Sequence, residues 1–199
     1  ANKVKMEENK KKLHDAYLIE KQLHELAEKN RIYDELEAKH GKQTDRICEL
    51  LALCKDADAD ELRAYMKEIM LIGTYIKRSA NLYFLGKEYE MLPQQEIRLT
   101  FDEAVRALNA GGIECGVAYL TTRAMRTSEV ARLLELVKDV VGMKRGGLHS
   151  LFLSLSDTEM NLSVECEGDL LEVVSSKVTA CMEEGLWLIR TQIGGGDNG

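Results

Sequence analysis

One histidine and one glycine stand side by side in the middle of a long charged segment. The stretch RIYDELEAKHGKQ, residues 31–43, contains His40 followed by Gly41. A histidine imidazole can act as a nucleophile or a general base near neutral pH. Glycine costs about 1 kcal/mol in a helix interior relative to alanine, so Gly41 asks for a reason. The pair marks this stretch as a candidate reactive-histidine site.

Two carboxylates one helical turn apart form a second candidate site. Glu135 and Asp139 are four residues apart in a strongly apolar segment, so a helix would place them on one face. Mg²⁺ prefers carboxylate and water oxygens, which makes Asp139 a candidate metal ligand. The alternative is a solvated polar stripe on an amphipathic helix, as most such pairs are.

Composition limits the classes of protein to which these sites can belong. The 199 residues are 45% hydrophobic and 31% charged, which indicates one or two folded domains. A net charge of −7 argues against a nucleic-acid surface. The five cysteines include no CxxC pair, which favours reduced, mostly buried thiols and no zinc site. No apolar run approaches the roughly 18–20 residues of a membrane span.

A heptad pattern predicts one long helix over residues 3–54. Seam positions follow one another at alternating steps of three and four residues, and charged residues fill the flanks. Such a helix is not stable alone in water, so a partner helix is implied. The apolar seam positions include Ala16, Ile19, Leu23, Leu26, Tyr33, Ile47 and Leu51, and the polar interruptions are Asn30, Glu37, His40 and Thr44.

A second helix is predicted over residues 60–86. The stretch KDADAD, residues 55–60, looks like a tight connection in which Asp58 or Asp60 caps the next helix. A single helical hairpin leaves apolar surface uncovered. Two copies forming a four-helix bundle would cover it, so we expect a homodimer.

Strands and helices alternate after Gly86. The string TFDE, residues 100–103, fits a capping box for a helix over 101–109 that ends at Gly111 and Gly112. Ser128 is the expected N-cap of the helix that carries Glu135. Alternating patterns predict strands over 113–120, 148–156, 160–167 and 186–193, a turn at 157–159 and a helix over about 170–184. We therefore expect an α+β fold, in which a coiled coil and a helical hairpin precede a mixed sheet with helices on one face.

The order of these parts resembles the cytoplasmic transmitter of a bacterial sensor histidine kinase. Arg31, Ile32, Glu35, Leu36 and Gly41 match in register the histidine box of the nitrate-sensor and desaturase-sensor type, which runs Arg-Ile-x-x-Glu-Leu-His-Asp-x-x-Gly. The string IKRSANLYFL resembles the end of the second dimerisation helix. LTFDEAVRALNAGGIECGVAY resembles the first helix and second strand of the family's Bergerat-type ATPase domain, and SEVARLLELVKDVV stands where its asparagine-box helix should be.

This resemblance implies a division of the chain into four parts. A coiled-coil lead would cover residues 1–30 and a dimerisation hairpin residues 31–88. An ATPase-like domain would follow over residues 89–193, with a flexible tail over 194–199.

The residues that carry the family's phosphotransfer chemistry are replaced at the histidine box. By the register of Gly41, the phosphoacceptor histidine falls at Glu37 and the acid–base aspartate at Ala38. No phosphoramidate can form at Glu37, and Ala38 cannot accept a proton. His40 is the alternative phosphoacceptor, and otherwise it is a histidine of the helical seam.

The nucleotide-binding boxes depart from the family's pattern as well. Glu135 and Asp139 keep the asparagine-box spacing, with Asp139 in place of the asparagine that binds Mg²⁺. In the nucleotide-reading loop, Cys166 replaces the aspartate that recognises adenine, Gly168 is retained and Leu170 replaces a glycine. ATP and Mg²⁺ are therefore implied as cofactors only if this site survives.

The function that the resemblance implies is signal transmission by a degenerate, kinase-like protein. We expect a homodimer through the helical region and a response regulator or other signalling protein as partner, and no nucleic acid. We also expect a cytoplasmic location, with an upstream membrane sensor domain as tether. Two alternatives remain: a divergent but active sensor kinase that binds ATP and phosphorylates a histidine, and a non-enzymatic coiled-coil dimerisation scaffold.

Overall fold

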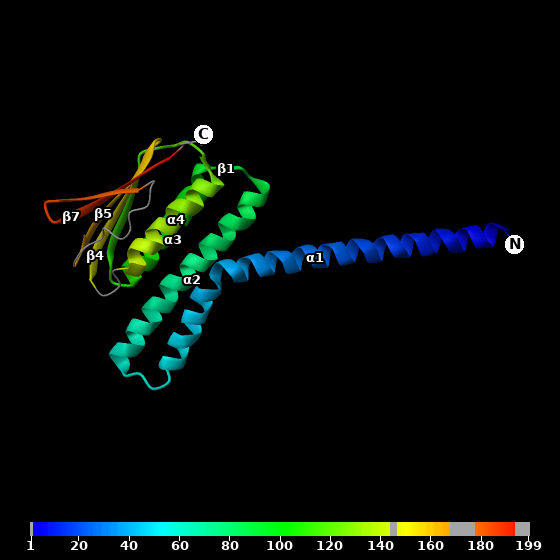
Figure 1. The fold of residues 1–199 in the computed structure, drawn as a ribbon, viewed down its shortest axis with the longest axis horizontal. Coiled ribbons are helices and arrows are strands. Elements are labelled where there is room, and N and C mark those ends of the chain that lie inside the picture. Colours follow the sequence, from blue (N-terminus) through cyan, green and yellow to red (C-terminus); the bar gives the residue numbers. More distant parts are fainter. Residues whose placement is uncertain (1, 144–146, 168–177, 194–199) are drawn as a thin grey trace. The chain divides into compact units, whose positions relative to one another are not determined.

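The computed structural model describes residues 2–143, 147–167 and 178–193 (Figure 1). The chain divides into two compact units, Ala1–Arg46 and Ile47–Gly199, each described only over these ranges. The first unit lies entirely within one long helix, and the second holds a further long helix, two shorter helices and two sheets. None of the described helices combines the length and the apolar character needed to traverse a lipid bilayer.

The predicted long N-terminal helix is confirmed as α1, Asn2–Leu53. Four of its apolar seam residues are exposed in the single chain: Ile19, Leu23, Leu26 and Tyr33 are 57%, 61%, 55% and 68% exposed. These exposed apolar positions are where the sequence predicts that a partner helix packs.

Helix α2, Ala59–Glu88, begins where the sequence predicted. The Asp58 carboxylate accepts hydrogen bonds from the backbone N–H groups of Asp60 and Glu61, both at 2.9 Å. The Glu61 side chain accepts one from the Asp58 N–H at 3.1 Å, which completes a capping box. Further along, Tyr75 and Leu82 are buried in the same core as the sheet.

The C-terminal half of the chain contains a five-stranded mixed sheet with the strand order β2-β4-β5-β7-β6. Only the β2–β4 pair is parallel. A second, two-stranded sheet pairs β1 with β3. The strands are β1 Met91–Leu92, β2 Glu114–Tyr119, β3 Met125–Arg126, β4 Leu148–Leu155, β5 Glu159–Cys166, β6 Val178–Glu183 and β7 Leu186–Gln192.

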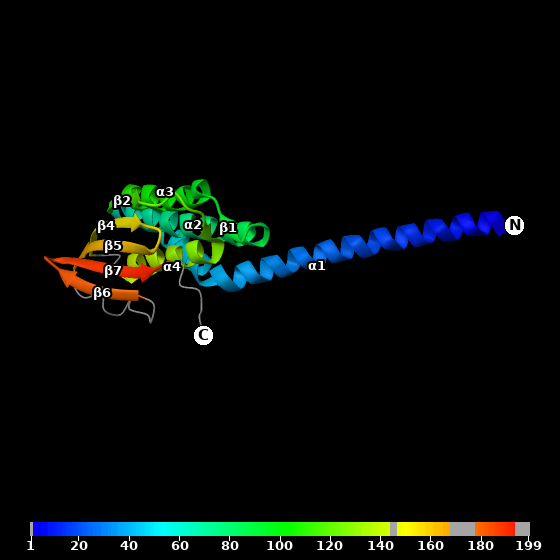
Figure 2. The same cartoon turned by 90° about the horizontal axis from the view of Figure 1, so that it is seen from above.

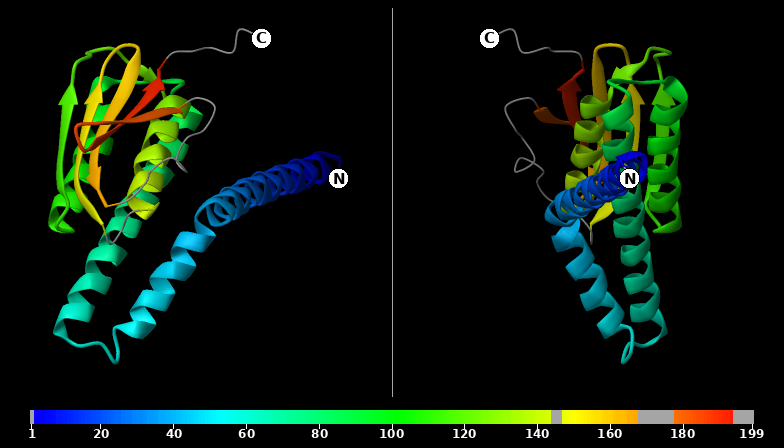
Figure 3. Two further views of the ribbon diagram at one scale, coloured as in Figure 1. Left: turned by 60° about the vertical axis from the view of Figure 1, so that its left-hand side comes forward. Right: turned by 90° about the vertical axis from the view of Figure 1, so that its right-hand side faces the viewer.

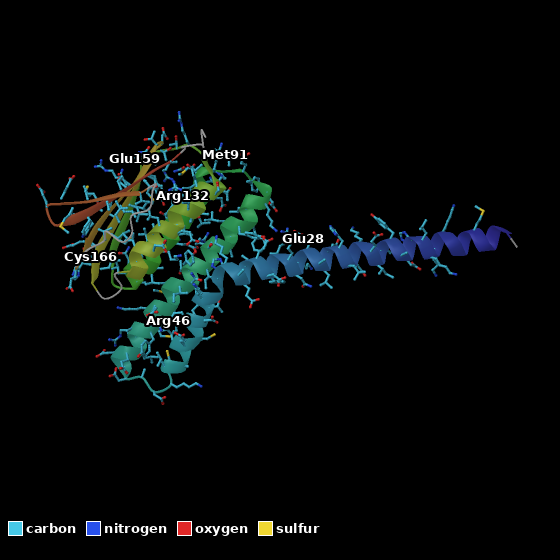
Figure 4. All side chains as sticks on the ribbon, viewed as in Figure 1. Glu28, Arg46, Met91, Arg132, Glu159 and Cys166 are labelled. Carbon is cyan, nitrogen blue, oxygen red and sulfur yellow. The ribbon has the colours of Figure 1, made fainter. Side chains whose placement is uncertain are left out.

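Helices α3, Gln94–Ala110, and α4, Thr127–Met143, cover one face of this sheet (Figures 2 and 3). Alternate strand residues point into the layer between them, and Leu153, Leu162 and Ile189 are at most 1% exposed. Arg132 of α4, labelled in Figure 4, donates to Thr191 Oγ1 and to the carbonyl oxygen of Gln192, both at 2.7 Å. The predicted fold class is thus confirmed.

The predicted start of the third helix is wrong. Helix α3 begins directly after Pro93, whose carbonyl accepts hydrogen bonds from the N–H groups of Glu96 and Ile97. Thr100 lies inside the helix, where its hydroxyl donates to the Glu96 carbonyl at 2.8 Å. Pro93 is the N-cap of α3, with extended backbone angles of φ −67° and ψ 154°, so the helix starts well before the capping-box pattern at residues 100–103.

Two further boundaries also differ from prediction. Ser128 is not the N-cap of α4, because the helix already includes Thr127. Val178–Glu183 is strand β6, not the end of a helix, and the rest of the predicted helix falls on residues 168–177, which lie outside the described residues. Glu184 and Gly185, at φ 52° and 87°, form a tight hairpin turn that joins β6 to β7.

Candidate functional site

The histidine-box positions of α1 differ in exposure. Glu37 and Ala38 are exposed, whereas His40 is only 4% exposed. The Thr44 hydroxyl donates to the carbonyl oxygen of His40 at 3.1 Å, one helical turn away. The phosphoacceptor position of the resemblance thus presents a carboxylate to solvent, and the neighbouring imidazole is buried.

Gly41 is not explained by crowding. A Cβ atom placed on Gly41 would meet nothing within 4 Å. The residue therefore lowers the stability of α1 without making room for a neighbour.

Glu135 and Asp139 do share one face of α4, but a lysine joins them. Lys138 Nζ lies 2.7 Å from Glu135 Oε2 and 3.1 Å from Asp139 Oδ1. The Tyr75 hydroxyl of α2 donates a hydrogen bond to Glu135 Oε1. Lys138 Nζ also lies 5.1 Å from the centre of the Tyr75 ring. We call these four residues, Tyr75, Glu135, Lys138 and Asp139, the α2–α4 cluster.

One cation, Lys138, pairs with both carboxylates of the α2–α4 cluster. Burial by itself would lower the pKa of Lys138, but its hydrogen bonds to Glu135 and Asp139 outweigh this and raise it, so the ammonium stays charged. Burial and the hydrogen bond to Glu135 raise the pKa of Tyr75 far above its usual range, so the phenol keeps its proton and remains a donor. The two carboxylates therefore already hold a cation.

The nucleotide-reading positions are described only in part. Cys166 is the last residue of β5, opposite Leu148 of β4, and packs half-buried against the core (Figure 4). Gly168 and Leu170 lie outside the described residues. Among the residues that are described, no group of three or more His, Cys, Asp or Glu side chains is placed to hold a metal ion.

The cysteines carry no disulfide, as the sequence predicted for reduced thiols. The expectation that most are buried is wrong, because Cys48 and Cys181 are exposed and the other three are of intermediate exposure. Burial raises the pKa of Cys115 to about 12, so this thiol stays protonated.

Two residues that contact Glu135, namely Lys138 and Tyr75, were not identified from the sequence. Lys138 follows Glu135 by three residues, a spacing at which oppositely charged side chains of a helix form ion pairs, so the sequence could have indicated this contact. Tyr75 lies sixty residues before Glu135, so only the packing of α2 against α4 brings it to the carboxylate.

Comparisons with known proteins find similarity in structure only. No protein-family model matches the chain, and no curated protein sequence matches it. A bacterial phosphotransferase is similar over 80% of this chain and 92% of its own, at 10% identity and a TM-score of 0.44.

Two histidine kinase structures are similar at the same level. The kinase domain of the blue-light activated histidine kinase EL346 from Erythrobacter litoralis matches over 75% of this chain and 95% of its own, at 13% identity and a TM-score of 0.42. The cytoplasmic segment of histidine kinase QseC matches over 69% and 97%, at 11% identity and a TM-score of 0.38. Because all three TM-scores are below 0.5, the proposal that follows rests on this chain's own residues.

Proposed function

We propose that this chain is the signal-transmitting portion of a sensor histidine-kinase-like protein that performs no phosphotransfer of its own. The observation that carries the proposal is the α2–α4 cluster. Lys138 and Tyr75 engage the carboxylates at the asparagine-box positions, where the resemblance expects a nucleotide-bound Mg²⁺. Glu37 at the phosphoacceptor position supports the same conclusion, because a carboxylate cannot form a phosphoramidate.

Exposed apolar side chains support a homodimer through the helical region. Leu62, Met66 and Met70 of α2 follow one another at four-residue steps and are 39%, 52% and 36% exposed. Leu51 near the end of α1 is 51% exposed. A second copy of the hairpin would cover both stripes in a four-helix bundle.

The proposed mechanism is mechanical. An upstream sensor, held at a membrane, would change the register or twist of paired α1 helices. Polar seam residues Asn30, Glu37 and His40 would weaken the packing locally and bring two registers close in energy. The α/β part, meaning α3, α4 and the strands β1 to β7, would then expose or hide a surface for a response regulator or another signalling protein. Disulfide cross-linking along the seam tests this, since a single register under all conditions contradicts it.

An active, divergent kinase is the second candidate function, and the retained carboxylates Glu135 and Asp139 favour it. It requires that ATP displace Lys138 from both groups. A dimerisation scaffold without any nucleotide function is the third candidate, for which the exposed seam of α1 is the supporting observation.

Acid-labile phosphate incorporation tests the proposal. Purified protein incubated with ATP and Mg²⁺ should take up none, and the His40→Gln variant should behave identically. Uptake by the unaltered protein that His40→Gln abolishes would show His40 to be a displaced phosphoacceptor and would overturn the proposal.

A further inference from the structure

We propose that the junction between α2 and the α/β part is locked, so that α2, α3, α4 and the sheet move as one rigid body. The claim concerns only the described residues from the start of α2 to residue 193, and it stands apart from the proposed function, since it needs neither nucleotide nor partner. It concerns the junction around the predicted domain boundary between residues 88 and 89, here taken as residues 86–93.

The first fastening lies where Gly86 of α2 meets Thr127, the first residue of α4. A Cβ atom on Gly86 would stand 3.1 Å from Thr127 Cγ2, closer than ordinary van der Waals contact. The Thr127 hydroxyl donates to the Tyr89 carbonyl at 2.7 Å, and the Thr127 N–H donates to the Glu90 carbonyl at 2.9 Å. The start of α4 therefore binds the backbone that leaves α2.

The two-stranded sheet makes the second fastening on either side of that contact. Met91 pairs with Arg126, and Leu92 pairs with Met125. Leu92 is fully buried and Met125 is 5% exposed, so this short ladder is anchored in the core. A linker that allowed its flanking parts to swing would have its backbone in water instead.

The third fastening holds α2 along its length. Arg78 is 5% exposed, and its Nε and Nη2 atoms contact the two carboxylate oxygens of Glu103 on α3. Lys77 Nζ adds a contact at 3.1 Å to the same carboxylate. Tyr75, less than one turn earlier, donates to Glu135 on α4. Polar contacts thus tie one stretch of α2 to both helices that cover the sheet.

These three fastenings have one consequence for any signal that reaches α2. Separating α2 from the α/β part would remove Glu103 from Arg78, break the hydrogen bond from Tyr75 to Glu135 and pull Gly86 away from Thr127, all at once. Packed cores with such contacts have discrete arrangements and do not bend continuously. A displacement of α2 is therefore passed on to the sheet, and the switch does not lie at residues 86–93.

Native-state hydrogen exchange on the full chain tests the lock. Amides of α2 between Ile72 and Leu85 should open together with those of β4 and β5, with rates that stay within about threefold of one another as denaturant is added. If α2 amides exchange more than about tenfold faster while β4 and β5 remain protected, α2 opens by itself and the lock is refuted.

Two matched glycine variants locate the lock at the junction. Relative to Gly73→Ala, Gly86→Ala should speed exchange of residues 86–92 by about fivefold, because both variants gain helix propensity but only the Gly86 methyl group meets Thr127, at 3.1 Å. Gly73→Ala is the control, since a Cβ there meets nothing within 4 Å in the same helix. Equal effects of the two variants on residues 86–92 would contradict the assignment of Gly86 and Thr127 to the lock.

Discussion

At the scale of single residues, Lys138 occupies Glu135 and Asp139, the two carboxylates that the resemblance assigns to an asparagine box. Its ammonium lies within 3.1 Å of both carboxylates, so a metal ion would have to displace an internal cation. The sequence alone showed two carboxylates at helical spacing and a nearby lysine. It could not show whether lysine, metal or water would bind them, because this depends on side-chain geometry and on Tyr75 from another helix.

The hydroxyl of Tyr75 should contribute measurably to stability. Tyr75→Phe keeps the ring but leaves Glu135 with one hydrogen bond fewer in a half-buried place. Because hydrogen bonds to charged groups contribute about 1.5–3 kcal/mol, we expect a loss of about that size in the free energy of unfolding in urea. Tyr89→Phe, at a side chain that is 53% exposed, is the control and should change little.

Glu103 should give the protein a specific sensitivity to acid. Hydrogen bonding to Arg78 lowers the pKa of Glu103, although burial opposes this. A carboxyl whose pKa is lower when folded stabilises the protein above its unfolded value of about 4.3, and this is lost as the pH falls through the folded value. Glu103→Gln should therefore be less stable at pH 7 and lose less stability below about pH 4.3.

Urea unfolding at several pH values between about 7 and 3 measures this difference. Glu88→Gln, at the exposed end of α2, serves as the charge-matched control. If Glu103→Gln and the unaltered protein lose stability in parallel below pH 4.3, the ion pair with Arg78 does not have the assigned role.

At the scale of secondary-structure elements, Asn109 joins the end of α3 to the edge of the sheet. Its Oδ1 accepts from the Cys115 N–H at 3.0 Å, and its Nδ2 donates to the Cys115 carbonyl at 2.8 Å. The amide thus imitates a neighbouring strand at the start of edge strand β2. Such blocking of an edge protects it from pairing with other chains.

Replacing Asn109 should weaken this element and open the edge. Asn109→Ala leaves the N–H and the carbonyl of Cys115 to water, and we expect a loss of about 1–2 kcal/mol and faster aggregation, measured by urea unfolding and light scattering. Asn109→Asp keeps the acceptor for the Cys115 N–H and should show an intermediate loss. An alanine variant as stable as the unaltered protein would show that Asn109 is dispensable.

How far the elements could be predicted depended on the range of the interactions that fix them. The Asp58 capping box and the β4–β5 hairpin follow from local hydrogen bonds and alternation, and both were predicted. The predicted range of α3 was too short because threonine, here Thr100, is common both as an N-cap and inside a helix. Strand β6 was missed because its partner β7 stabilises it, and the turn at Glu184 and Gly185 was read as a helix end.

At the scale of the whole molecule, the exposed apolar stripe of α2 should mediate self-association. Leu62→Lys combined with Met66→Lys places two charges in the proposed bundle core. If the unaltered protein is the proposed homodimer, this double variant should be a monomer, as measured by light scattering after gel filtration. Phe152→Lys is the control, because Phe152 is 50% exposed on a strand of the sheet. A stable dimer in the double variant would place the interface elsewhere.

Titration with a non-hydrolysable ATP analogue and Mg²⁺ during thermal unfolding is the most direct test of the central claim. A ligand present at 100 times its dissociation constant stabilises the folded state by about 2.7 kcal/mol, which raises Tm by several degrees. Because Lys138 and Tyr75 engage the retained carboxylates, we predict no change in Tm up to millimolar analogue. A saturable rise in Tm that requires Mg²⁺ would show a working nucleotide site and contradict the account of a degenerate transmitter.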